Sequence, residues 1–171
     1  MKIYTYPHPI LRRSAGPVKN IDEDLQQLID RMIETMYETS AIGLAANQVG
    51  ALSRVIVFDV AYKDKGRNPS VLINPEIILS EGKIASEESC LSVIDFCTEV
   101  NRNGQIKVRG VDRNGNPLDI EGEDTLAICL QHEIDHLDGR LIIDYISGLK
   151  RTIYRKRLKK MLKKDTGSTN S

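Results

Sequence analysis

The segment 125–137 constrains the fold of this chain more than any other stretch. It contains no glycine or proline that would turn the backbone before its last residue, and its apolar side chains fall on several sides of a helix. A surface helix has one apolar stripe, whereas a helix that is apolar around most of its circumference is buried. The sequence therefore predicts a buried central helix. Its apolar positions are Leu126, Ile128, Leu130, Ile134 and Leu137.

The periodicity of other segments predicts an α+β fold around this helix. Residues 22–38 carry apolar side chains at helical spacing, with Asp22 as the expected N-cap. Residues 105–112 alternate apolar and polar side chains, and Asn114-Gly115 is expected to supply the two left-handed residues of a hairpin turn. We expect mixed or antiparallel sheets packed on the central helix. The other expected elements are a loop with a short strand at 41–50, strands at 55–60, 71–74 and 77–79, a final helix at about 146–164, and a disordered tail at 165–171.

Length and composition fit one domain that spans residues 1–171. Apolar residues make up 40% of the chain and charged residues 28%, which is typical of globular proteins and excludes a disordered chain. No apolar run approaches the length of a membrane-spanning helix, and Pro7 interrupts the N-terminus before a signal peptide could form. Three cysteines are an odd and small set for a disulfide framework. We expect a cytoplasmic monomer with reduced thiols and no membrane contact.

The charges are unevenly distributed along the chain. Residues 150–164 contain nine Lys or Arg and no acid, although the formal net charge of the whole chain is zero. Without these nine, 15 of the 24 bases remain against 24 acids. A basic C-terminal helix on an acidic body predicts a polyanionic partner.

The central helix carries the residues of a metal site. His132 and His136 lie four residues apart, so both imidazoles are on one face, separated by one turn of ~5.4 Å. Glu133 lies beside the pair, where it can take a proton from a water on the metal. The H-E-x-x-H pattern therefore predicts a catalytic divalent-metal centre that hydrolyses its substrate.

A catalytic site of this kind needs a third protein ligand and an open position for water. Metzincin proteases would place a histidine where this chain has Ile142. Cys129 is on the same helix, but the rise of ~10.5 Å to His136 is too long for a shared ion. Cys90 and Cys97 lie on a separate segment that can approach the helix, and the polar surroundings of Cys90 favour it as a thiolate ligand.

Three segments together resemble the peptide deformylase family, whose members remove the N-formyl group from nascent bacterial proteins. They are Gly-Leu-Ala-Ala-Asn-Gln at 43–48, Glu-Ser-Cys-Leu-Ser at 88–92 and Gln-His-Glu-Ile-Asp-His-Leu-Asp-Gly at 131–139. Their order and spacing also match, and the likeness extends from about residue 3 to residue 164. Two other classes remain open on the residues alone: a zinc peptidase that cleaves internal bonds, and a non-catalytic ribosome-binding domain with a structural metal.

The resemblance implies a mechanism and a set of site residues. Cys90, His132 and His136 would bind the metal, Glu133 would be the general acid and base, and the Gln48 side-chain amide and the Leu91 backbone N–H would stabilise the oxyanion. The family's ion is natively Fe(II), with Ni, Co or Zn able to substitute. The substrates would be N-formyl-methionyl nascent peptides. The basic helix would contact ribosomal RNA.

The resemblance also implies how the substrate is held. Its backbone would pair with Ile42, Gly43, Glu88 and Ser89, in the manner of an added strand. Ile128, Cys129 and the ring of His132 would line the pocket for the methionine side chain, with Ser86 and Thr125 near it. Arg102 would reach a substrate carbonyl or, as the simpler alternative, form a surface salt bridge. The chain departs from the family pattern at four positions: Ala41, Asn47, Ser89 and Ile94. Ser89 adjoins the proposed thiolate, and at the other three we expect only a mild adjustment of the loops.

Overall fold

The structure is a computed structural model that describes the backbone of residues 1–167 and the side chains of residues 1–163. The helices are α1 (Glu23–Glu38), α2 (Tyr62–Lys65), α3 (Asp124–Leu137) and α4 (Gly148–Gly167), with short 3-10 helices η1 (Pro9–Arg12), η2 (Ala46–Val49) and η3 (Ile142–Asp144). The strands are β1 (Gly43–Ala45), β2 (Val55–Phe58), β3 (Ser70–Glu81), β4 (Ile84–Cys90), β5 (Val93–Arg102), β6 (Gln105–Val111) and β7 (Pro117–Glu123).

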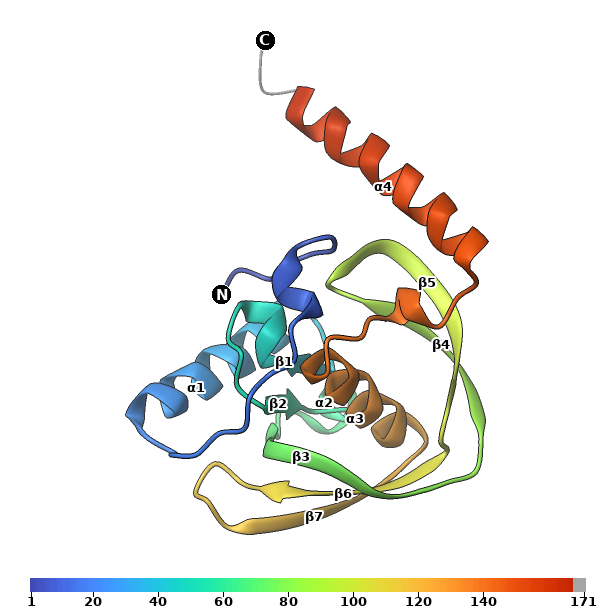
Figure 1. The fold of residues 1–171 in the computed structure, drawn as a ribbon. Coiled ribbons are helices and arrows are strands. Elements are labelled where there is room, and N and C mark those ends of the chain that lie inside the picture. The colour runs from blue at the N-terminus through green and yellow to red at the C-terminus, as the bar shows by residue number, and fades with distance from the viewer. Residues whose placement is uncertain (168–171) are drawn as a thin grey trace.

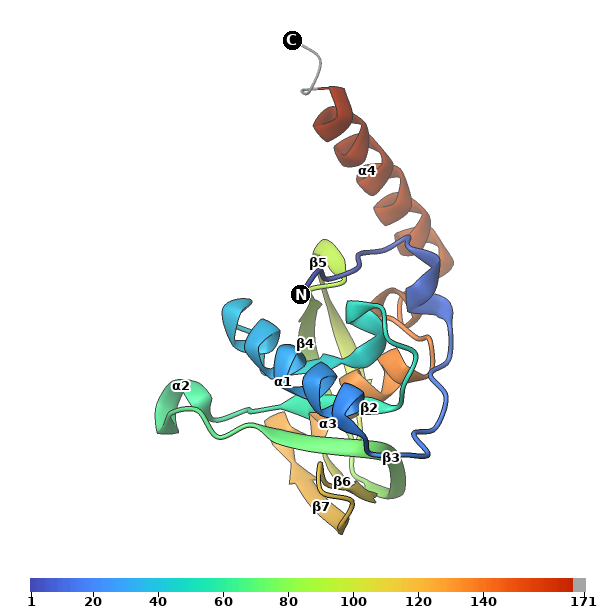
Figure 2. The ribbon, with the colours of Figure 1, turned by 90° about the vertical axis from the view of Figure 1, so that its left-hand side faces the viewer.

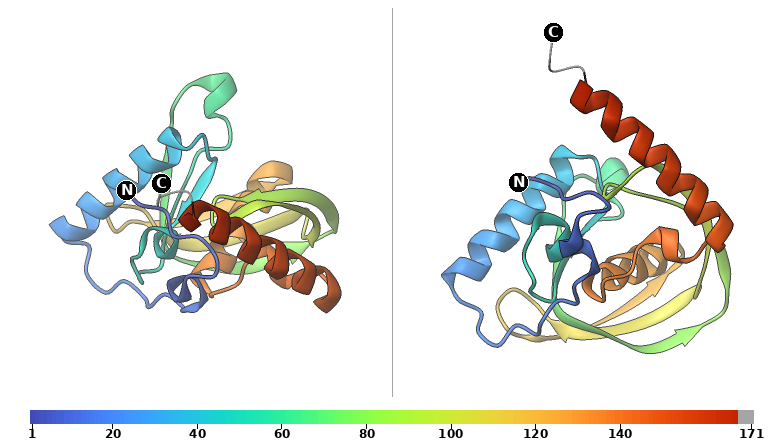
Figure 3. Two further views of the ribbon diagram at one scale, coloured as in Figure 1. Left: turned by 90° about the horizontal axis from the view of Figure 1, so that it is seen from above. Right: turned by 45° about the horizontal axis from the view of Figure 1, so that its top comes forward.

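The strands form one five-stranded sheet and one separate hairpin, and α3 lies between them. The sheet has the order β1-β2-β3-β6-β7, the hairpin is β4-β5, and every pairing is antiparallel. Figure 1 shows α3 at the centre, with the sheet on one side and the long hairpin curving around another. The right-hand view of Figure 3 shows the same enclosure. The predicted α+β fold with a buried central helix is confirmed.

Strand β2 is buried on both faces because it separates two apolar clusters. Ile56 faces the α3 side, where Leu130 and Leu137 are fully buried. Val57, one residue later, faces the α1 side, as expected from the two-residue period of a strand. The N-terminus of α1 is capped as predicted, because the Asp22 carboxylate accepts a hydrogen bond from the Leu25 N–H at 3.0 Å. The cluster on the α3 side packs α3 against β1 and β2.

Two predicted strands are in fact one. The runs 71–74 and 77–79 belong to the single strand β3, which shifts its register against β6 between Ile73 and Glu76. Asn74 has a φ of 53° at this point, and Pro75 has no N–H for the ladder, so the strand bulges rather than ends. The predicted turn is also partly wrong. Gly115 has a positive φ of 86°, but Asn114 is not left-handed among the described residues.

The hairpin of β4 and β5 was not predicted from periodicity. Strand β4 is Ile-Ala-Ser-Glu-Glu-Ser-Cys, which has too few apolar residues to alternate visibly. Its register pairs Ser89 with Cys97, and a shift then pairs Cys90 with Val93 at the tip. Cys90 therefore lies where the hairpin turns back toward α3.

Helix α4 projects away from the body of the molecule (Figures 1 and 2). Tyr154 and Leu158 are buried in a cluster with Leu11 and Val93, which attaches the first half of the helix. Ile153, on the same helix, is 59% exposed. The helix also continues through Gly167, so the predicted tail at 165–171 is helical at its start, and 168–171 lie outside the described residues. Within the described part of the chain, no helix has the length and apolar character required to cross a membrane.

Candidate metal centre and active site

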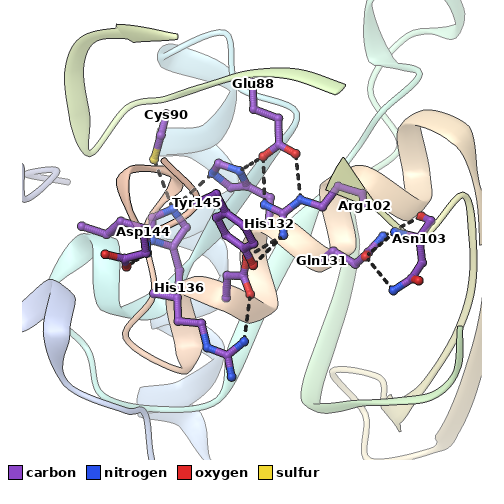
Figure 4. Close-up of polar contacts among 12 residues, drawn as sticks. Glu88, Cys90, Arg102, Asn103, Gln131, His132, His136, Asp144 and Tyr145 are labelled. Atoms are coloured by element: carbon purple, nitrogen blue, oxygen red, sulfur yellow. Dashed lines mark hydrogen bonds and ion pairs between the residues drawn. The ribbon is translucent and has the colours of Figure 1, made fainter. Parts of the chain in front are cut away.

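The third predicted ligand reaches the two histidines from a different element. His132 and His136 lie on α3, and Cys90 ends β4. The His136 Nε2 atom is 3.2 Å from the His132 Nε2 atom and 3.1 Å from the Cys90 Sγ atom. Figure 4 shows these three side chains pointing toward one another. All three ligand atoms lie within 4.8 Å of each other.

This donor set fits a divalent metal ion. Ligand bonds of about 2.0 to 2.3 Å in a tetrahedral site place the ligand atoms roughly 3.3 to 3.8 Å apart, close to the separations found. Two imidazoles and a thiolate are ligands that several divalent transition metals accept. Burial lowers the pKa of His136 well below its ordinary value, which favours the neutral imidazole that binds metal.

The other two cysteines do not join the cluster. Cys97 is exposed, and its Sγ donates to the Glu87 Oε1 at 3.2 Å. Cys129 is buried and donates to the carbonyl oxygen of Ile42 at 3.6 Å. Burial raises the pKa of the Cys129 thiol well above its usual value, so Cys129 is a neutral packing residue beside the site.

The orientation of His132 is set by a buried carboxylate. The His132 Nδ1 atom is 2.8 Å from the Glu88 Oε2 atom, so the ring presents Nε2 to the ligand cluster. Glu88 is held in turn by Arg102, whose Nε and Nη2 donate to its two oxygens at 2.7 and 2.9 Å. Burial would raise the pKa of Glu88, but the hydrogen bonds from Arg102 and His132 outweigh it and lower the pKa. A carboxylate behind a ligating histidine is a common outer partner of metal sites.

This arrangement corrects the prediction for Arg102. Its side chain is 4% exposed and is occupied by Glu88 and by Asp135 on α3, so it forms a buried ion-pair network rather than a surface salt bridge. Arg102 is not among the residues that line the cavity described below. The side-chain role of Glu88 was missed from the sequence. A signal was present, because residues two apart on a strand share a face, and Glu88 precedes Cys90 by two.

Glu133 lies one residue after His132 and is 5% exposed. Its Oε2 atom has no hydrogen-bond partner among the described residues. Burial raises the pKa of Glu133 to about 7, which suits a group that exchanges protons near neutral pH. Gly43 packs directly against it, since a Cβ at Gly43 would be 2.7 Å from the Glu133 Oε1 atom.

Gln48 places its amide group beside the ligand cluster. Its Oε1 accepts from the Ala45 N–H at 2.8 Å, which leaves the Nε2 to face the cluster. The Nε2 is 3.2 Å from the Ser92 Oγ and 3.9 Å from the Cys90 Sγ. Leu91, which follows Cys90, is 37% exposed.

A cavity of about 620 Å³ opens onto the cluster. Its walls come from the loop before β1, from β4 and from the start of α3. Most residues predicted to contact the substrate line it, together with Ser86, Ala41 and Thr125: Ile42, Gly43, Glu88, Ser89, Leu91, Ile128, Cys129 and His132. Gln48 and Cys90 also line it, whereas Glu133 lies behind Gly43.

The family model for polypeptide deformylase matches residues 1–152. The chain belongs to the polypeptide deformylase family. A peptide deformylase from Thermodesulfovibrio yellowstonii is 52% identical over 159 residues, which cover 93% of this chain and 96% of that protein. The crystal structure of a peptide deformylase from Legionella pneumophila is similar, with a TM-score of 0.89, 43% identity and 96% of both chains covered. A peptide deformylase from Ehrlichia chaffeensis in complex with actinonin has a TM-score of 0.88 at 36% identity, covering 94% of this chain and 96% of that one.

Asn47 has a structural role in this deformylase that the sequence did not indicate. The sequence predicts only a mild loop adjustment at this position. Its side chain is fully buried, and its amide donates to the backbone carbonyl of His136 near the end of α3. Asn47 therefore ties η2, which carries Gln48, to the helix that carries both histidines.

Proposed function

We propose that the chain is a metal-dependent hydrolase that removes the N-formyl group from formyl-methionyl peptides and releases formate. The convergence of Cys90, His132 and His136 beside the buried Glu133 carries this proposal, together with the 620 Å³ cavity that Cys90 and His132 line. Family membership supports it, because the proteins that resemble this chain over almost their whole length are peptide deformylases. We further propose a single domain that acts as a monomer in the bacterial cytoplasm.

The proposed ligands of the metal are Cys90, His132 and His136. We propose Fe(II) as the native ion, with Ni, Co or Zn able to replace it, because two imidazoles and a thiolate accept all of them. When bound, a divalent ion supplies a Lewis acid that lowers the pKa of a coordinated water and polarises a carbonyl.

Glu133 moves the proton in this scheme. Its Oε2 has no partner among the described residues, so it is available to accept a proton from the water that adds to the formyl carbon. The same oxygen then returns the proton to the amine nitrogen as the C–N bond breaks, which gives formate and a free N-terminus. The Gln48 amide and the Leu91 N–H donate to the formyl oxygen, where negative charge develops.

The walls of the cavity support the proposed substrate contacts. The backbone of the peptide would lie between Ile42-Gly43 and Glu88-Ser89, which all line the cavity. The methionine side chain would enter between Ile128, Cys129 and the ring of His132. Ser86 and Thr125 add hydroxyl groups to this wall.

Release of formate from a formyl-methionyl peptide by the metal-loaded protein tests the function. Glu133→Ala is expected to lower kcat by at least about a hundredfold, in the range known for loss of a general acid or base. Glu34→Ala is the matched control, because Glu34 is exposed on α1, and it should retain full activity. Mass spectrometry of the products separates the two hydrolase classes. Cleavage of an internal peptide bond without formate would show a peptidase instead.

We also propose that α4 binds ribosomal RNA. The observation in favour is the projection of a helix that carries nine bases and no acid between 150 and 164. Deleting residues 150–171 would also remove Tyr154 and Leu158 from the core, so substitution is the cleaner test.

The variant is Lys156→Gln, Lys159→Gln and Lys160→Gln together, because all three side chains are exposed on α4. It should weaken salt-sensitive ribosome binding while formate release from a short peptide is unchanged. The matched control replaces three exposed lysines elsewhere, Lys19, Lys65 and Lys83, by Gln. Equal ribosome affinity of the two triple variants would contradict the proposal.

A further inference from the structure

Behind the metal ligands, a chain of polar contacts continues to the surface of the molecule. Arg102, which holds Glu88 with Nε and Nη2, donates through Nη1 to the Asp135 Oδ2 at 2.5 Å and to the Tyr145 hydroxyl at 3.2 Å. The Tyr145 hydroxyl donates to the same Asp135 oxygen at 2.6 Å. Figure 4 shows the Tyr145 side chain next to the guanidinium of Arg102.

Tyr145 also covers the guanidinium with its ring. The Arg102 Cζ is 4.8 Å from the centroid of the Tyr145 ring, in the range of a cation–π contact. Tyr145 is 41% exposed, whereas the Arg102 and Asp135 side chains are only 4% and 13% exposed. The tyrosine therefore separates the buried ion pairs from solvent.

This position matters because Arg102 joins three elements. It lies on β5, holds Glu88 on β4 and pairs with Asp135 on α3, the helix that carries both histidines. Charged hydrogen bonds that are shielded from water are stronger and more directional than exposed ones. Removing the Tyr145 hydroxyl would take one hydrogen-bond partner from Arg102 and one from Asp135 and would let water compete for both, so Glu88 would hold the His132 ring less firmly.

We propose that Tyr145 is a positioning residue for the metal site, which acts through Arg102 and Glu88 on the ring of His132. This inference rests on the metal site of the proposed function. Tyr145 directly follows η3, is not among the residues that line the cavity, and is not one of the three proposed ligands. Its role is to keep the His132 Nε2 aimed at the position of the ion.

The chain contains a closely matched control in Tyr37. The Tyr37 hydroxyl donates to the Asp59 Oδ2 at 2.6 Å, and the Arg67 Cζ lies 4.5 Å from its ring centroid. The same three groups are thus combined at the end of α1, in a cluster that holds none of the proposed ligands. Tyr145→Phe and Tyr37→Phe each remove one hydroxyl from a tyrosine–carboxylate–guanidinium group and keep the ring.

The experiment loads wild type and both variants with Co(II) and measures the rate of metal loss to an excess of a strong chelator. Tyr145→Phe is expected to lose the ion about threefold faster, which is less than the roughly ten- to hundredfold cost of losing a direct partner of a metal ligand, because Tyr145 acts through Arg102 and Glu88. The visible absorption of its bound Co(II), which reports ligand geometry, should shift as well. Tyr37→Phe should match wild type in both measurements and lower the unfolding temperature of the metal-free protein.

Two results would overturn the proposal. One is a rate of metal loss in Tyr145→Phe equal to that of wild type. The other is equal acceleration in both variants, which would show a general loosening of the fold. Formate release by the metal-loaded wild type is measured separately. A protein that binds Co(II) and releases no formate refutes the proposed function, but the rates of metal loss still decide the role of Tyr145.

Discussion

Gly43→Ala is expected to displace Glu133 without unfolding the protein. A Cβ built at Gly43 would be 2.7 Å from the Glu133 Oε1, 3.0 Å from its Cγ and 2.8 Å from the Cys129 Sγ. Ordinary contacts of a Cβ begin at 3.4 Å, so the neighbours are about 0.7 Å too close. The φ of Gly43 is not positive, so alanine meets no backbone strain there. The conflict is therefore entirely between the new methyl group and these two side chains.

The size of the effect follows from this geometry. Glu133 is 5% exposed and Cys129 is 4% exposed, so neither can swing into solvent. Overpacking of this kind costs about 1–3 kcal/mol of stability. A misplacement of about 1 Å in a reacting group lowers the rate by about a hundredfold, so a shift of 0.7 Å should lower kcat by about ten- to a hundredfold.

The assay measures kcat and KM for formate release, together with unfolding by urea and the metal content. Gly104→Ala is the control, because the nearest side-chain atom to its Cβ would be the Ile84 Cβ at 4.0 Å. It should resemble wild type in every measurement. A Gly43→Ala protein with normal kcat and a raised KM would refute the reasoning, because the methyl would then disturb the substrate and not Glu133.

Three further predictions concern stability. Asp144→Asn should cost about 1 kcal/mol at pH 7, because partly exposed ion pairs are screened by solvent. Burial favours a higher pKa for Asp144, but the hydrogen bonds from Arg12 outweigh burial, so the pKa is lowered in the folded protein. The carboxylate therefore makes its full contribution to the free energy of unfolding above its ordinary pKa, and this contribution is lost as the pH falls. Urea unfolding of wild type and variant should therefore converge in acid. Adding Co(II) to the metal-free protein at 100 times its Kd should raise the free energy of unfolding by about 2.7 kcal/mol, and Cys90→Ala should abolish most of this gain. In urea unfolding, Leu130→Ala, at a fully buried site on α3, should lower the free energy of unfolding by about 2–5 kcal/mol. Leu149→Ala should lower it by almost nothing, because Leu149 is 73% exposed.

The elements that could be predicted from the sequence are those with a local pattern. An apolar stripe and an N-cap predict helix α1, and alternation with a glycine turn predicts the hairpin of β6 and β7. Strands β4 and β5 lack such a signal because their outward side chains are polar and their inward ones include Glu88 and Arg102. Those two residues face inward only because α3 brings Asp135 and His132 to meet them.

The residues of the candidate site also divide into those that a local sequence pattern predicts and those that depend on contacts between distant segments. Two ligands and Glu133 follow from the spacing of a single helix, which is a local property. The choice of Cys90 over Cys97 depends on the register of the hairpin, in which the two residues lie on either side of the turn. The buried position of Arg102 depends on three separate elements. Neither can be derived from periodicity, because each is settled by contacts between residues far apart in sequence.

A buried helix that carries two histidines and a glutamate is costly unless other elements supply partners. The β4-β5 hairpin supplies them on one side, where Glu88 binds His132 and Arg102 closes the network. Elsewhere around α3, three buried atoms remain without a partner among the described residues: Asn47 Oδ1, Glu133 Oε2 and His136 Nδ1. Each unpaired buried polar atom costs about 1–3 kcal/mol, so stability alone would favour apolar residues here. Of these three atoms, Glu133 Oε2 is the one that takes part in the proposed reaction, so function, and not stability, accounts for its unpaired position.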